Sequence, residues 1–84
     1  MKNEIKSNLI KLEQLEEIAN QAEADYEREP ENAEYEAAFD RAYENQFAMF
    51  MTVSNQIAEF SGIDAKTARA IVRGKREELK KILA

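Results

Sequence analysis

The 84-residue sequence contains no cysteine, no histidine and no tryptophan, and only two glycines and one proline. Without cysteine, the chain can form no disulfide framework, no thiolate zinc site and no thiol nucleophile. Without histidine, it lacks the commonest general base and the commonest transition-metal ligand. The serines at 7, 54 and 61 therefore have no histidine to activate them. We predict a protein that is not an enzyme and that uses no cofactor or metal.

The scarcity of glycine and proline indicates an almost entirely helical chain, and 35% of its residues are charged against a usual share of about 25%. The length favours one domain, residues 1–84. The longest apolar run, Phe47–Met51, is far shorter than the ~20 residues of a membrane-spanning helix. The segment Met1–Ile5 lacks the apolar core of a signal peptide. We therefore expect a cytoplasmic location and no contact with a membrane.

The net charge of −5 is unevenly distributed along the chain. Residues 1–60 hold five basic and fourteen acidic residues, a net charge of −9, whereas residues 61–84 hold seven basic and three acidic residues, a net charge of +4. Such asymmetry favours an anionic partner for the basic segment. The acidic part, which is densest over Glu23–Glu36, suits a basic protein partner.

Apolar residues recur every three or four positions in two long segments, which is the spacing of amphipathic helices. The first predicted helix covers about residues 3–28. It ends before Pro30, which disfavours helical geometry at the residue before it and suits the first turn of a new helix. The second predicted helix covers about residues 31–60. A short connection between two long helices predicts an antiparallel hairpin.

A third amphipathic helix is predicted over residues 65–83. Gly62 can end the preceding helix in a left-handed conformation, and Asp64 is a good N-cap for the third. Gly74 is the point at which this helix could bend or split, because glycine lowers helix stability by about 1 kcal/mol relative to alanine. The predicted fold is all-α: a long hairpin with a third helix folded against it, a three-helix bundle.

Residues 57–74 read IAEFSGIDAKTARAIVRG. They combine a small residue for a close helix crossing, a glycine for a tight turn and apolar residues between two helices: Ala58, Gly62, Ile63, Ala68 and Ile71. This pattern resembles the DNA-binding helix-turn-helix of lactose-repressor-type regulators, whose second helix enters the major groove. The resemblance implies that Lys66 reads base edges and that Arg69 and Arg73 contact bases or phosphates. Arg76 lies on the same basic face and extends the candidate contact.

Two interpretations of residues 57–74 remain open, because a helix, a glycine turn and a second helix also form a corner of many helical bundles. In the first, the segment binds duplex DNA. Phosphate repulsion then requires the acidic hairpin to point away from the duplex. In the second, the chain is a protein–protein adaptor whose acidic hairpin docks a basic partner, and residues 65–83 only complete the bundle.

In its general character the short, acidic, helical chain with a basic end is similar to the small accessory proteins of bacteriophages and mobile elements. We therefore expect a non-enzymatic intracellular accessory protein that binds a macromolecule. Duplex DNA is the most specific version of this expectation, and a protein partner is the alternative.

Residues 47–53 are apolar on nearly every side of the second predicted helix, so more than one neighbour must cover them. The third helix, a second subunit or both could do so. A domain of this size without disulfides or metals commonly gains stability by oligomerisation. We predict a homodimer with Met49, Phe50 and Met51 in the contact.

Acidic pairs on the predicted helices are the one feature that could suggest a metal site. Glu13 and Glu16 have the spacing with which helical bundles that hydrolyse nucleotides hold Mg²⁺. The second pair, Glu36 and Asp40, has a different spacing and no basic neighbour for a phosphate. We therefore predict no metal site.

Overall fold

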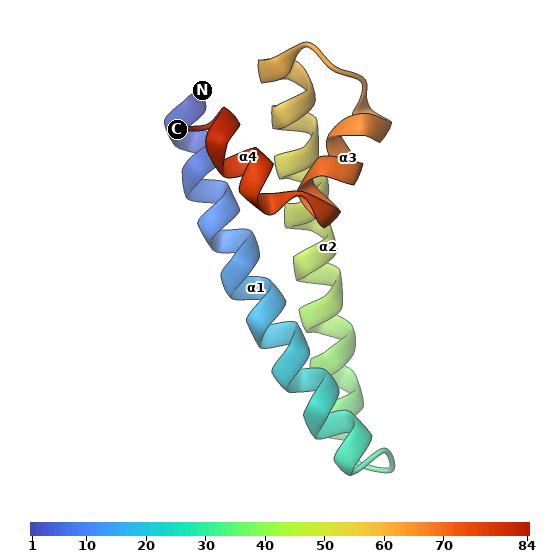
Figure 1. Ribbon diagram of the computed structural model, residues 1–84. Helices are drawn as coiled ribbons and strands as arrows, with labels where there is room; N and C mark the ends of the chain where they lie inside the picture. Colours follow the sequence, from blue (N-terminus) through green and yellow to red (C-terminus); the bar gives the residue numbers. More distant parts are fainter.

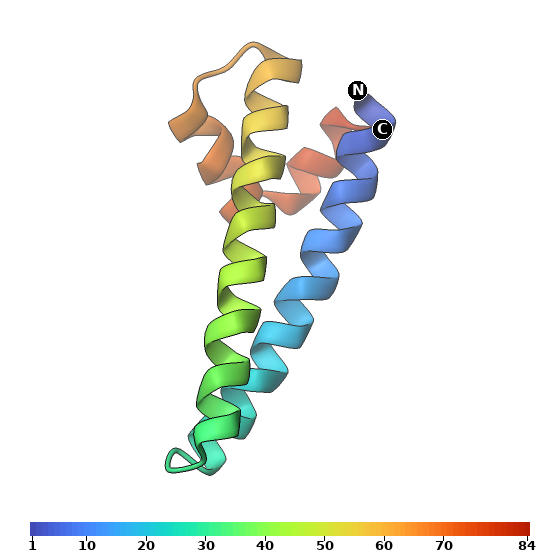
Figure 2. The ribbon, with the colours of Figure 1, turned by 180° about the vertical axis from the view of Figure 1, so that it is seen from behind.

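The computed structural model describes all residues, Met1–Ala84, and its regular secondary structure is helical throughout (Figure 1). The four helices are α1 (Lys2–Arg28), α2 (Ala33–Ser61), α3 (Ala65–Gly74) and α4 (Arg76–Ile82). α1 and α2 form a long antiparallel hairpin. α3 and α4 pack at the end of the hairpin that holds both termini (Figures 1 and 2). The prediction of an all-α fold is confirmed.

The structure corrects the predicted third helix, because residues 65–83 form two helices instead of one. α3 ends at Gly74, and the backbone of Lys75 (φ −134°, ψ 52°) leaves the helical region before α4 begins. The break lets α3 lie against α2 while α4 turns back toward α1 (Figure 1). Burial gives the physical reason: Val72 of α3 and Leu79 of α4 are both fully buried, and the change of direction brings each helix to a different member of the hairpin.

The hairpin turn lies around Pro30, but α2 begins at Ala33, two residues later than expected. Asn32 is the N-cap. Its side-chain Oδ1 accepts hydrogen bonds from the backbone N–H groups of Glu34 (3.0 Å) and Tyr35 (3.4 Å). Because the first amide groups of a helix have no partner within it, these bonds determine where α2 begins.

The hydrophobic core lies at the end of the molecule where all four helices meet. It consists of ten buried residues: Ile5, Leu9, Leu12, Phe50, Val53, Ile57, Ala68, Val72, Leu79 and Leu83. The other half of the hairpin buries only Ala19 and Ala42. That half is therefore two helices thick, and several of its large side chains are exposed. None of the four helices has both the length and the apolar character that crossing a membrane requires.

Candidate nucleic-acid interface

The end of α2 and the whole of α3 are two helices joined by a short turn at Gly62, within the segment that carries the predicted helix-turn-helix pattern. Gly62 adopts the left-handed conformation (φ 67°, ψ 31°), and its backbone N–H donates to the carbonyl of Ala58. The N–H of Ile63 donates to the same carbonyl at 3.1 Å. Gly62 is the only residue of the chain with a positive φ, a conformation that other residues adopt with strain. The turn therefore depends on this glycine.

Apolar side chains hold α3 in place. Ala68 and Val72 are fully buried, and Ile63 and Ile71 pack partly buried against the same core. Ala58 is half-buried at the helix crossing. The inner face of α3 is therefore fixed, and its outer face is left to solvent.

Three of the four predicted DNA-contacting residues lie on α3 and take part in no ion pair. Lys66 and Arg73 are exposed, and Arg69 is half-buried. The ion pairs of the structure involve only Arg28, Arg76 and Lys80 as basic partners. Arg73 makes one other contact, because its guanidinium carbon lies 5.4 Å from the centroid of the Phe50 ring. This cation–π contact holds the side chain of Arg73 against α2, where it lines a cleft with Tyr43 and Phe47.

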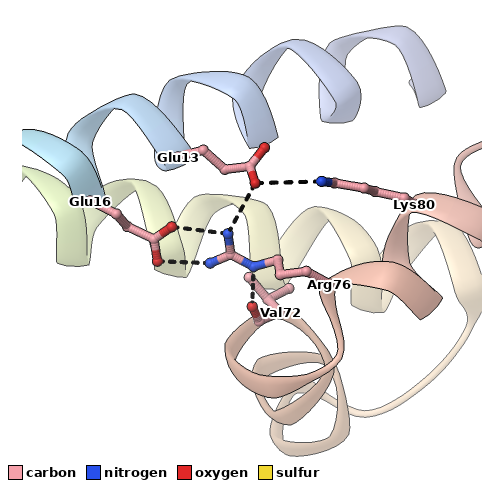
Figure 3. A network of polar contacts seen from close by, with 5 residues as sticks. All are labelled: Glu13, Glu16, Val72, Arg76 and Lys80. Atoms are coloured by element: carbon pink, nitrogen blue, oxygen red, sulfur yellow. Dashed lines mark hydrogen bonds and ion pairs between the residues drawn. The ribbon is translucent and has the colours of Figure 1, made fainter.

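Arg76, the fourth predicted residue, faces the hairpin and not the outer side of α3 (Figure 3). Its Nη1 and Nη2 donate to the two carboxylate oxygens of Glu16 at 2.9 and 2.8 Å. Its Nε donates to the carbonyl of Val72. The side chain of Arg76 is only 20% exposed. Its donors are thus occupied within the protein, and the candidate interface rests on the other three basic residues.

The two carboxylates with the spacing of a magnesium pair lie in the same network (Figure 3). Glu13 Oε2 lies 3.8 Å from Nη1 of Arg76 and 3.7 Å from Nζ of Lys80. No three acidic side chains of the chain gather in a way that could hold a metal ion. The sequence did not reveal this network, because Arg76 reaches Glu16 only through the change of direction at Lys75.

Asp64 occupies the N-cap position of α3, as predicted, but its side chain makes no capping hydrogen bond of standard geometry. The hydroxyl of Thr67 lowers the pKa of the Asp64 carboxyl, and the backbone N–H of Thr67 and the charge of Arg69 lower it further. The carboxylate is therefore ionised at neutral pH. Its negative charge lies at the end of α3 that also carries Lys66.

The acidic part of the hairpin extends away from the Gly62 turn and α3 (Figures 1 and 2). The turn at Pro30 and the turn at Gly62 lie at opposite ends of a molecule that measures 45 × 21 × 19 Å (Figures 1 and 2). The most acidic part of the chain is therefore remote from α3.

The residues predicted to contact a second subunit lie against the core of their own chain. Phe50 belongs to that core and is 9% exposed, and Met49 and Met51 pack half-buried against it. The predicted dimer contact stays a prediction. The large side chains that α2 leaves exposed are instead Tyr43, Phe47 and Phe60. Helical periodicity alone did not separate them from the covered residues.

Lys66, Arg69 and Arg73 are hydrogen-bond donors on one short helix, of the kinds that pair with phosphate oxygens and with the edges of guanine. The chain matches no protein-family model, no curated protein and no solved structure.

Proposed function

We propose that the protein is a non-enzymatic DNA-binding accessory protein of the cell interior and that α3 contacts the major groove of duplex DNA. One observation carries the proposal. The Gly62 turn and the buried residues Ala68 and Val72 hold α3 by its inner face, while Lys66 and Arg73 are exposed. The position of the acidic hairpin supports the same conclusion.

α3 has the dimensions that the contact requires. An α-helix with its side chains is about 10–12 Å in diameter, which fits the width of the major groove, about 12 Å, and the ten residues of α3 extend about 15 Å along it. Lys66, in the first turn, lies where a recognition helix reads base edges. Arg69 and Arg73, one and two turns further along, would bind phosphates or bases. Three cations make a small interface, so we include in the proposal a homodimer that presents two α3 helices to two half-sites.

Salt dependence and substitution test DNA contact. The wild type should bind a fluorescent duplex, and its affinity should fall steeply between about 50 and 200 mM salt, because each neutralised phosphate releases counterions. Lys66→Ala and Arg69→Ala should each weaken binding by about 1–3 kcal/mol without lowering the melting temperature. Lys11→Ala removes an exposed lysine from α1 and is the matched control. A wild type without salt-sensitive binding would contradict the proposal.

Substitution of Asp64 should strengthen DNA binding instead of weakening it. Asp64→Ser keeps an N-cap residue and removes a negative charge from the end of α3. If α3 faces phosphates, this variant should bind the duplex more tightly than the wild type. Unchanged or weaker binding by a folded Asp64→Ser variant would count against the proposed orientation of α3.

Sedimentation tests the proposed homodimer. If Met49 contributes to the contact, Met49→Glu should convert a dimer into a folded monomer. Phe50→Glu cannot make this distinction, because Phe50 lies in the core and a buried charge there should unfold the chain. A wild type that sediments as a monomer at all concentrations would exclude the dimer.

The second candidate function is that of a protein–protein adaptor. It is favoured by the exposed aromatic residues Tyr43 and Phe47, which lie on the hairpin beside acidic residues. Charge reversals across Glu23–Glu36 should abolish capture of a defined basic partner and leave DNA binding intact. Unchanged capture of that partner by the charge-reversed variants would contradict the adaptor function.

A further inference from the structure

Aromatic rings follow one another along the hairpin below α3 and α4. Tyr26 stacks on Phe39 with ring centroids 5.8 Å apart, and Phe39 meets Tyr43 edge-on at 6.4 Å. Further along α2, Phe47 lies 6.4 Å from Phe50. We call Phe39, Tyr43 and Phe47 the aromatic stripe. Its three members follow one another at four-residue spacing along α2, so they lie on one side of the helix.

The aromatic stripe continues the face of α2 that α3 and α4 cover. Phe47 and Tyr43 precede Phe50 by three and seven residues, so all three share one side of the helix. Phe50 is covered, but Phe47 is 52% and Tyr43 57% exposed. Both line a cleft of about 170 Å³, together with Arg73 of α3 and Arg76 of α4. α3 and α4 therefore cover this face of α2 at Phe50 and leave it uncovered at Phe47 and Tyr43.

Carboxylates border the aromatic stripe on both sides. Glu36, Asp40 and Glu44 form a row at four-residue spacing along α2. Asp40 and Glu44 line a groove together with Phe39 and Tyr43. On α1, Glu23 and Glu27 continue the helix face that begins at Glu16. These five carboxylates are exposed, and none takes part in an ion pair.

α4 shows which kinds of side chain pack against this side of the hairpin. Its Leu79 is fully buried in the core, while Arg76 and Lys80 reach across to Glu16 and Glu13 on α1. An apolar residue flanked by basic residues thus covers the face at its core end, near Phe50. The other end of the face, at Tyr43 and Phe47, has the same combination of apolar side chains and nearby carboxylates, but no helix covers it.

We infer that the aromatic stripe docks an amphipathic helix of a partner protein, with an apolar side flanked by lysine or arginine. Its apolar side chains would cover Phe47 and Tyr43, and its basic residues would pair with the acidic residues on both sides of the stripe. Arg76 and Lys80 of α4 pair with Glu16 and Glu13 in the same way. Charge argues against a second copy of the chain. Residues 16–44 carry eleven acidic and two basic residues, a net charge of −9, so two copies facing each other here would repel.

The docking surface lies on the hairpin, whereas Lys66 and Arg69 lie on α3. Arg73 alone is common to both proposals, because it also lines the cleft beside Phe47. Helix docking deepens the adaptor function and does not depend on DNA contact, so either proposal can fail while the other stands. The closing experiment is chosen accordingly, because its readout contains no DNA.

Two synthetic helical peptides of equal length and equal leucine spacing test the inference, one with lysine and one with glutamate beside the leucines. Each is titrated into the isotope-labelled full chain and followed by amide NMR. The lysine peptide should shift the resonances around Phe39–Phe47, and the glutamate peptide should shift none. Phe47→Ser should weaken the lysine peptide at least tenfold. Ile18→Ser, which removes an equally exposed apolar residue from α1 (57% exposed), should leave its affinity unchanged.

The acidic rows are tested in the same titration. Glu23→Gln and Asp40→Asn should each weaken the lysine peptide and reduce the salt dependence of its binding, whereas Glu59→Gln, near the Gly62 turn, should not. Tyr43→Ser serves as a second stripe variant if Phe47→Ser does not fold.

Three outcomes would overturn the inference: equal binding of both peptides, full affinity of the folded stripe variants, or resonance shifts centred outside the stripe. A Phe47-dependent dimer of the chain alone, seen by sedimentation, would also overturn it, because the occupant would then be a second copy.

Discussion

Arg76 of α4 and Glu16 of α1, sixty residues apart in the sequence, form a bidentate ion pair with N–O distances of 2.9 and 2.8 Å. The two side chains are 20% and 31% exposed, so water screens the pair only in part. Parallel hydrogen bonds between guanidinium and carboxylate fix orientation as well as distance. This pair therefore holds α4 across the hairpin and completes the cover of the core.

Removal of the Arg76 guanidinium should destabilise the fold. Arg76→Met keeps the aliphatic stem but leaves Glu16 without its partner, and we expect the free energy of unfolding to fall by about 1–3 kcal/mol. Urea denaturation measures the change. Lys75→Met, at the exposed neighbouring position, is the control. The double variant with Glu16→Gln should lose less than the sum of the two single variants, and additive losses would show that the pair contributes no coupling.

Ser54 should be a position at which substitution stabilises the protein. Its side chain is fully buried, and its Oγ has no hydrogen-bond partner. A buried, unsatisfied polar group costs about 1–3 kcal/mol, so Ser54→Ala should raise the free energy of unfolding by about 1 kcal/mol. Ser7→Ala, at an exposed position of α1, corrects for the difference in helix propensity. An equal gain in both variants would mean that burial of the hydroxyl is not the cause.

The side chain of Asn32 should stabilise the first turn of α2. Because its side chain binds the N–H groups of Glu34 and Tyr35, Asn32→Ala should cost about 1 kcal/mol of stability. Asn32→Asp should retain most of it, since aspartate is an equally good cap. Thermal unfolding gives the stability, and amide exchange at Glu34 and Tyr35 shows whether the loss is local. Unaltered exchange in Asn32→Ala would contradict the role of the cap.

Asp64 should make stability depend on pH in the acidic range. Thr67 and Arg69 lower the pKa of this carboxyl in the folded chain below its ordinary value of 3.8. The resulting stabilisation is therefore present above the ordinary pKa and is lost as pH falls through the lowered one. Asp64→Asn should be less stable than the wild type at neutral pH, and the gap should close below about pH 4. Melting temperatures of both proteins across this range provide the test, and a gap that is constant with pH would contradict it.

Local sequence signals were sufficient wherever the structure is determined within a few residues. Apolar spacing predicted the two hairpin helices, Pro30 marked the turn between them, and Gly62 marked the end of α2. Each of these signals acts through backbone geometry or through one face of one helix. The same is true of the inner face of α3, where Ala68 packs as its place in the pattern predicted.

The candidate site could be predicted only in part, for a related reason. Lys66 and Arg73 are exposed as expected, because residues on the face opposite an apolar stripe lie in solvent. Arg76 was placed on the same face by counting along one continuous helix. The break at Lys75 invalidates that count and turns its side chain toward Glu16.

Sequence by itself thus determined that the chain is helical, where its hairpin and its Gly62 turn lie, and that catalysis by cysteine or histidine is excluded. Gly74 marked where the last helix could divide, but only the tertiary structure decided that it does. Tertiary structure also decided that Arg76 joins α4 to α1, and that Phe50 is covered while Phe47 and Tyr43 are not. Periodicity shows which residues share a face of a helix. How far a neighbour covers that face depends on the length and direction of a helix distant in the sequence, and these follow from packing in three dimensions.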